Sequence, residues 1–89
     1  MMRVPRRRSA APSRTIDGAA VVIQTRLAEV SMLNATGTLI WQAIDGVRDE
    51  TALAALVRAN FEVDGDAAAR DVAAFLDELA RADLVEFAR

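Results

Sequence analysis

The stretch that decides the fold is EVSMLNATGTLIW, residues 29–41. Its first part alternates polar and apolar residues, which is the period of a strand. Asn34 is typical of a helix N-cap, because its side-chain oxygen can accept a free backbone N–H of the first turn. Leu39, Ile40 and Ile44 then recur at helical spacing around Trp41, the only tryptophan. The stretch therefore predicts a short strand that ends at Asn34 and turns directly into a helix.

Two further strands are indicated upstream. Asp17-Gly18 separates two runs that contain apolar residues, and both residue types tolerate positive φ, so the pair predicts a two-residue hairpin turn. Ala19–Thr25 follows the turn with the β-branched segment VVI. Ala11–Ile16 precedes it as a weaker strand, which Pro12 restricts to a sheet edge. Together with Glu29–Leu33, these runs predict a three-stranded antiparallel meander.

Three helices are indicated downstream, over Ala35–Asp45, Glu50–Asn60 and Gly65–Ala82. Asp49 and Asp64 precede the second and third helices as N-caps, and Gly46 follows the first where a left-handed residue is common. Apolar residues at helical spacing form the inner faces of the second and third helices: Leu53, Leu56, Val57, Ala68, Val72, Phe75, Leu76 and Leu79. An apolar tail of Leu84, Val85 and Phe87 can close the core. We therefore expect an α+β, winged-helix-like fold, a three-stranded antiparallel β-meander followed by three α-helices.

The charge is distributed unevenly along the chain. Its 89 residues are the size of one small domain, and 53% hydrophobic residues are enough for a core. Residues 1–14 hold five arginines and no acid, whereas residues 15–89 hold six arginines and thirteen acids, which gives +5 and −7. We expect residues 1–10 to be a disordered basic tail and residues 11–89 to form the folded domain.

Several residue types on which enzymes depend are absent from the sequence. There is no Cys, His, Tyr or Lys, which removes thiolate and imidazole metal ligands, the commonest general base and any Schiff-base lysine. We therefore expect a binding module and no enzyme, with no metal and no cofactor. No run of about 18 apolar residues is present, so we expect no membrane segment. No apolar segment follows the Arg-rich start, so we expect a cytoplasmic protein.

The composition argues against two other functions. A winged-helix DNA reader needs positive charge on the helix that enters the groove. The third predicted helix instead holds two arginines against Asp66, Asp71, Asp77 and Glu78, a net charge of −2, so we expect no nucleic acid partner. A carrier protein needs a serine at a helix start, and none of the three serines lies there.

The third strand of the meander has one neighbour, so its other edge presents unpaired backbone groups. Glu29–Leu33 has a single charge and neither Pro nor Gly to blunt that edge. A peptide could add there as a further strand. Each backbone hydrogen bond nets about 0.5–1.5 kcal/mol, and micromolar binding needs about 8 kcal/mol, so an apolar groove must also take side-chain anchors. A short, harmless edge is the alternative that the pattern leaves open.

The order and spacing of several short motifs resemble the PqqD-like family. These motifs are MLNATG at 32–37, Ile40-Trp41, Asp45-Gly46, FEVD at 61–64, Asp71-Val72, and Leu76, Leu79 and Leu84. The resemblance covers residues 15 to 87. It implies a RiPP precursor peptide recognition element, whose members bind the leader of a ribosomally made precursor peptide and present it to a modifying enzyme. In that family the leader adds to the third strand beside the third helix.

The resemblance also implies site residues. The peptide-binding residues would be Glu29, Val30, Ser31, Met32 and Leu33 on the strand and Arg70, Ala73, Ala74 and Asp77 on the helix. Asn34 and Asp71 would have structural roles, as a cap and as the source of an inter-element hydrogen bond. Val30 and Met32 stand where many relatives have aromatic residues, which implies a softer groove. Asp83 stands where relatives usually have Gly.

Two pathways fit this resemblance. In one, the protein serves a lasso-peptide or similar cluster and its partner enzyme is a leader peptidase. In the other, it is PqqD proper and presents the precursor of pyrroloquinoline quinone (PQQ) to a radical-SAM enzyme. The Leu-Asn-Ala-Thr-Gly run followed by Ile40-Trp41 favours the first pathway.

Overall fold

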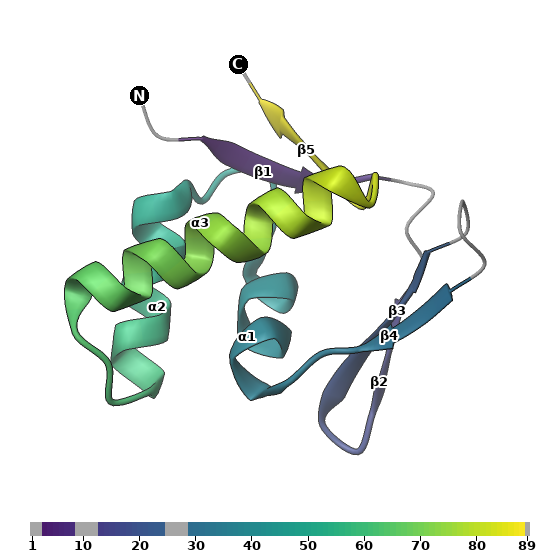
Figure 1. Cartoon of the computed structure of the whole chain (residues 1–89), viewed down its shortest axis with the longest axis horizontal. Coiled ribbons are helices and arrows are strands. Elements are labelled where there is room, and N and C mark those ends of the chain that lie inside the picture. Colours follow the sequence, from purple (N-terminus) through teal and green to yellow (C-terminus); the bar gives the residue numbers. More distant parts are fainter. Residues whose placement is uncertain (1–2, 9–12, 25–28, 89) are drawn as a thin grey trace.

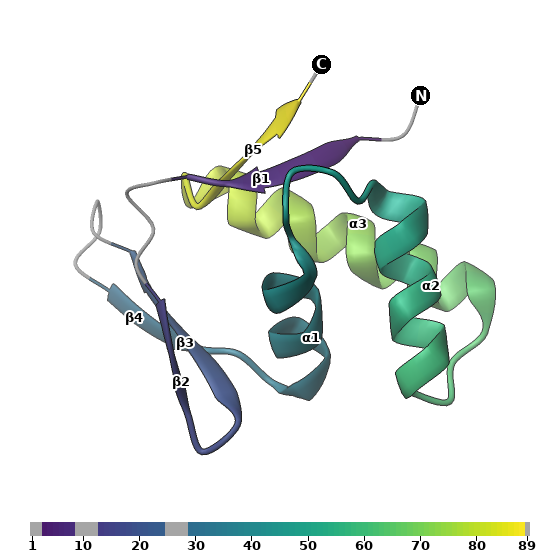
Figure 2. The same cartoon turned by 180° about the vertical axis from the view of Figure 1, so that it is seen from behind.

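The computed structural model describes residues 3–8, 13–24 and 29–88. Its elements are β1 (Val4–Arg7), β2 (Ser13–Ile16), β3 (Ala19–Gln24), β4 (Glu29–Met32), α1 (Ala35–Ala43), α2 (Glu50–Asn60), α3 (Gly65–Arg81) and β5 (Val85–Ala88). A sheet of β2, β3 and β4 lies at one end of the molecule, α2 lies at the other, and α1 lies between them (Figures 1 and 2). The long helix α3 starts beside α2 and runs past α1 toward the side of the sheet (Figures 1 and 2). The predicted α+β, winged-helix-like fold is confirmed.

The three-stranded sheet is an antiparallel meander in the order β2-β3-β4. Asp17 and Gly18 form the turn between β2 and β3 with φ of 52° and 82°, as a two-residue hairpin requires. β4 pairs with β3 so that Met32 lies opposite Val21 and Glu29 lies opposite Gln24. Residues 11, 12 and 25, which the sequence assigned to strands, lie outside the described residues. β4 thus has one partner and forms an edge of the described sheet.

The junction between β4 and α1 is held by side-chain hydrogen bonds. Asn34 Oδ1 accepts the Gly37 N–H at 2.8 Å, which confirms the predicted N-cap. Thr38 is 6% exposed, and its hydroxyl accepts the Ala20 N–H at 3.0 Å while it donates to the Leu33 carbonyl at 3.3 Å. One hydroxyl therefore joins the start of β3, the end of β4 and the first turn of α1.

Trp41 fixes α1 against the sheet. Its side chain is 1% exposed, and its Nε1–H donates to Ser13 Oγ on β2 at 3.1 Å. The indole thus has a packing role with its N–H satisfied, as is usual for a single tryptophan on a helix face.

The first helix ends two residues earlier than predicted, at Ala43. Asp45 Oδ1 accepts the backbone N–H groups of Val47 and Arg48, both at 2.9 Å, so it forms a side-chain turn in place of another helical turn. The two hydrogen bonds lower the pKa of Asp45 below its ordinary value, and the one from the Arg48 N–H has the larger effect. Gly46 has the expected positive φ, 80°, but lies in this turn beyond the helix.

α2 and α3 begin at the predicted caps. Asp49 and Asp64 each accept a backbone N–H three residues ahead, at 2.9 and 2.7 Å. Both helices turn their predicted apolar faces into one core, although Leu56 and Phe75 are only partly buried. The largest fully enclosed side chains among the described residues are Trp41, Leu53, Leu76, Val22, Val57, Val72 and Pro5.

α3 ends in a left-handed residue that is not glycine. Asp83 has a φ of 59°. Its N–H donates to the Ala80 carbonyl at 3.1 Å, and the Leu84 N–H donates to the Leu79 carbonyl at 2.9 Å. This is the hydrogen-bond pattern of a Schellman ending, in which glycine is the usual residue. The departure from the family pattern at position 83 therefore leaves the geometry of the turn intact.

The expected disorder of residues 1–10 is wrong for the part that the structure describes. Val4–Arg7 form β1, which pairs antiparallel with β5, and this ribbon lies along α3 (Figures 1 and 2). Pro5 is fully enclosed, and Arg6 pairs with Glu86 at 2.7 Å. The partners of these residues lie about eighty positions away in the sequence, so local composition could not reveal them.

Arg3 anchors this ribbon to both long helices. Its guanidinium pairs with Glu50 on α2 and, at 2.6 Å, with Asp77 on α3, and it lies 4.4 Å from the centroid of the Phe87 ring. The hydrogen bond to Asp77 raises the pKa of Arg3 above its ordinary value, and each of the contacts with Glu50 adds a smaller rise. Ion pairs with residues far away in the sequence thus order a segment whose charge alone indicated a disordered tail.

Candidate functional site

The free edge of β4 offers backbone hydrogen bonds at alternate residues. The Leu33 N–H donates to the Ala20 carbonyl at 2.8 Å, so residues 33, 31 and 29 direct their backbone groups toward β3. Val30 and Met32 belong to the other set, and their N–H and C=O groups point away from the sheet. Two amides and two carbonyls are therefore available to an added strand.

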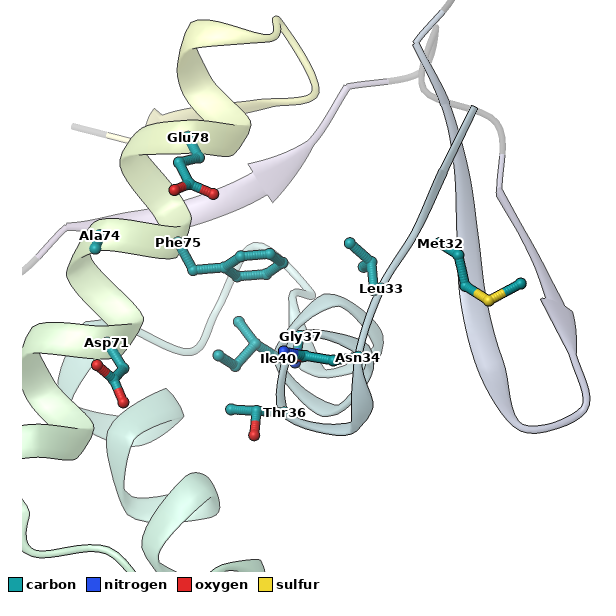
Figure 3. A pocket seen from close by; sticks show the side chains of 10 residues that line it. All are labelled: Met32, Leu33, Asn34, Thr36, Gly37, Ile40, Asp71, Ala74, Phe75 and Glu78. Atoms are coloured by element: carbon teal, nitrogen blue, oxygen red, sulfur yellow. Dashed lines mark hydrogen bonds between the residues drawn. The ribbon is translucent and has the colours of Figure 1, made fainter. Parts of the chain in front are cut away.

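A groove of about 460 Å³ opens beside this edge, between the end of β4, the start of α1 and one face of α3 (Figure 3). Its walls are formed by Met32, Leu33, Asn34, Thr36, Gly37, Ile40, Asp71, Ala74, Phe75 and Glu78. These residues come from β4 and its link to α1, from α1, and from α3. The Asn34 cap holds the end of β4 and the start of α1 together.

The floor of the groove is apolar. Ile40 is 2% exposed, and Leu33 and Phe75 are partly buried against the core. Phe75 projects from α3 toward Leu33 (Figure 3). A Cβ at Gly37 would lie 3.4 Å from the Phe75 ring and 3.2 Å from Asn34 Oδ1, so glycine lets the ring lie close to α1. The floor therefore provides a surface for an apolar side chain.

The α3 side of the groove is acidic. Asp71 and Glu78 project from the same side of α3, on either side of Phe75 (Figure 3). Both are exposed, and neither carboxylate forms a hydrogen bond or ion pair with another residue of the described ranges. The hydrogen bond expected for Asp71 is thus not found there, and its side chain faces the groove instead.

The structure brings together only some of the predicted site residues. Met32, which is 69% exposed, and Leu33 line the groove. Three more of the predicted residues, Glu29, Val30 and Ser31, lie on the edge strand β4, for which the structure describes the backbone at these positions but not the side chains.

On α3, only Ala74 of the four predicted residues lines the groove. Asp77 pairs with Arg3, and Ala73 lines an apolar hollow against α2. Arg70 lies beside a shallow hollow at the start of α3. The prediction used the flank formed by 70, 73, 74 and 77. The groove uses 71, 74, 75 and 78, which is one residue, or about 100°, further around the helix.

The groove is also lined by residues that were not among the predicted peptide-binding residues, namely Phe75, Glu78 and the α1 residues Thr36, Gly37 and Ile40. The i, i+3, i+4, i+7 set that starts at Asp71 was visible in the sequence. Phe75 belonged to the predicted apolar stripe, and the sequence did not tell which edge of that stripe faces β4.

The described residues show neither a metal site nor a membrane-spanning helix. They contain no group of three or more acidic side chains placed to hold a metal ion. No helix among them has the length and apolar character needed to cross a membrane.

Two solved structures share this fold along nearly their whole length. One is TbiB1 in complex with the TbiA(beta) leader peptide, with a TM-score of 0.82, 26% identity and coverage of 91% of this chain and 94% of that chain. The other is lasso peptide synthetase B1 complexed with the leader peptide, with a TM-score of 0.81, 25% identity and coverage of 93% and 98%. No curated protein matches the sequence.

The family described as coenzyme PQQ synthesis protein D (PqqD) matches residues 19–85. This range begins with β3 and ends at the start of β5, so it contains β4, α1 and α3, which form the groove. By its sequence, and with a fold shared with two solved B1 structures, the chain belongs to the PqqD family.

Proposed function

We propose that this protein binds the leader segment of a ribosomally synthesised precursor peptide and delivers it to a modifying enzyme. The observation that carries the proposal is the free edge of β4, which lies beside an apolar groove against α3. Both structural neighbours are complexes with a leader peptide, which supports a leader as the occupant.

The leader would bind as a strand added to β4. Its backbone would pair with the outward amides and carbonyls of Val30 and Met32. Four such bonds contribute about 2–6 kcal/mol, and micromolar affinity requires about 8 kcal/mol. One buried apolar side chain adds about 1.5–3 kcal/mol, so an anchor over Phe75 and Ile40 would supply much of the difference. We therefore assign the helix side of the site to the face that includes Ala74 and Phe75.

The protein would act without catalysing a reaction itself. Its sequence contains no Cys, His, Tyr or Lys, and none of its three serines lines the groove. We expect it to work in the cytoplasm, where precursor peptides are made, and to bind no nucleic acid through α3.

The partner enzyme would be the leader peptidase of a lasso-peptide type cluster. The two B1 neighbours favour this assignment. The alternative, presentation of the PQQ precursor peptide to a radical-SAM enzyme, is favoured by the description of the matching family. Both alternatives use the same groove.

The test is a titration of the ¹⁵N-labelled protein with the leader peptides encoded beside its gene. We expect amide shifts concentrated at residues 29–33 and along α3 from Asp71 to Glu78. A saturating leader that leaves both segments unmoved would contradict strand addition. Pull-down of the neighbouring peptidase or radical-SAM enzyme, with and without the leader, would then distinguish the two pathways.

A further inference from the structure

The two carboxylates of the groove form no ion pair with any residue that the structure describes. Asp71 and Glu78 both line the groove and are exposed, and neither has an ion-pair partner among the described residues. Asp77, on another face of the same helix, is by contrast paired with Arg3 at 2.6 Å. No arginine lines the groove, and the chain has no lysine. The groove wall is therefore negative when the site is empty.

The arrangement of the wall is acid, aromatic, acid along one helical face. Phe75 lies four residues after Asp71 and three before Glu78, so the two carboxylates are separated by seven residues, a rise of about 10 Å. In an added strand, alternate side chains face α3, and residues four apart are separated by about 13 Å. Long Arg or Lys side chains can reach across the difference of about 3 Å between these two spacings. An apolar residue midway between them would then lie over Phe75.

We propose that Asp71 and Glu78 select leader peptides by charge. The preferred leader carries an apolar anchor with an Arg or Lys two residues to either side, all facing α3. This inference rests on the proposed function and adds the chemical class of the leader to it. Peptides with acidic residues at the flanking positions are excluded, because their carboxylates would face those of the wall.

The test is a selection of binders from an mRNA-display library of random twelve-residue peptides. The bait is the full-length protein, and a parallel bait carries Asp71→Asn with Glu78→Gln. A matched control bait, Glu62→Gln with Asp66→Asn, removes the same charge from exposed acids outside the groove. We expect enrichment of Arg and Lys two residues from an apolar residue with the first and control baits, and none with the groove variant.

The affinities of the selected peptides give the magnitude. An exposed ion pair changes an equilibrium constant by about 1.4- to 5-fold, so two pairs predict a loss of about 2- to 30-fold in the groove variant. The loss should shrink in 1 M NaCl, where the Debye length is about 3 Å. The control variant should bind with nearly unchanged affinity.

The outcomes separate this inference from the proposed function. Selected peptides that shift the amides of β4 and α3 but show no basic enrichment overturn charge selection and leave leader binding in place. Equal loss of affinity in the groove and control variants overturns it as well, because net charge would then be the cause. If no selected peptide shifts the β4 and α3 amides, leader binding at this groove fails and charge selection fails with it.

Discussion

The direction of the backbone groups on β4 allows a substitution that separates leader binding from folding. The Met32 N–H points away from β3, and Met32 is 69% exposed, so Met32→Pro removes an outward donor without breaking the sheet. A leader carbonyl that met this N–H would be left unpaired. That loss is worth about 1–3 kcal/mol, or about 5- to 150-fold in affinity.

Two further variants provide the controls. Met32→Ala removes the same side chain and keeps the N–H, so the difference between the Pro and Ala variants measures the backbone contribution. Ser31 directs its N–H toward Val22 on β3, so Ser31→Pro breaks the sheet instead. We expect Ser31→Pro to lower the free energy of unfolding by about 1–3 kcal/mol more than Met32→Pro does.

Isothermal titration calorimetry with the cognate leader and urea denaturation of each variant supply the two measurements. The expected order of leader affinity is wild type, then Met32→Ala, then Met32→Pro. Equal affinity of the Ala and Pro variants, with both folded, would refute strand addition at this edge. Equal destabilisation by Pro at 31 and 32 would refute the assigned direction of the backbone groups.

Three other predictions concern the fold that positions the groove. Thr38→Val should lower the free energy of unfolding by about 1–3 kcal/mol in urea denaturation, because it leaves the Ala20 N–H and the Leu33 carbonyl without their partner; a change within error would contradict the role of Thr38 at the junction. Arg3→Gln should cost about 1–2 kcal/mol, since it removes two partly exposed ion pairs and a contact with an aromatic ring, and should speed hydrogen exchange in Val4–Arg7; unchanged exchange there would mean that Arg3 does not anchor the ribbon. The pKa of Asp45 is lowered in the folded state, so its carboxylate stabilises the fold at pH values above the unfolded-state pKa of 3.8, and this stabilisation is lost as the pH falls through the lower folded-state pKa. Asp45→Asn should therefore make the melting temperature decline less on acidification. Melting temperatures that fall in parallel with pH for the two proteins would argue against this.

Local signals were sufficient for most of the architecture. The Asp-Gly hairpin and the Asn34, Asp49 and Asp64 caps depend on residues within three positions of each other, and each is found as predicted. Asp45 shows where such signals compete. Gly46 predicted a longer first helix, but the Asp45 side chain hydrogen-bonds the backbone ahead of it and the helix ends at Ala43.

The errors arose where the outcome depends on residues far apart in the chain. Arg3 and Arg6 suggested a solvated tail, yet their partners lie on α2, α3 and β5. Ion pairs over such separations leave no periodic pattern in the sequence. The predicted peptide-binding residues of α3 lie one residue to the side of those that line the groove, because helical spacing defines a stripe but not the element that lies beside each of its edges.

The sequence by itself determined the strands β2, β3 and β4 and the three helices, and that β4 continues into α1 through Asn34. It also established that the chain contains no Cys, His, Tyr or Lys. The tertiary structure decided that the outward backbone groups belong to Val30 and Met32, and that Asp71, Phe75 and Glu78 form the opposite wall. The physical reason is that turns, caps and periods arise from contacts between near neighbours, whereas the groove is formed between α3 and a strand about forty residues earlier in the chain.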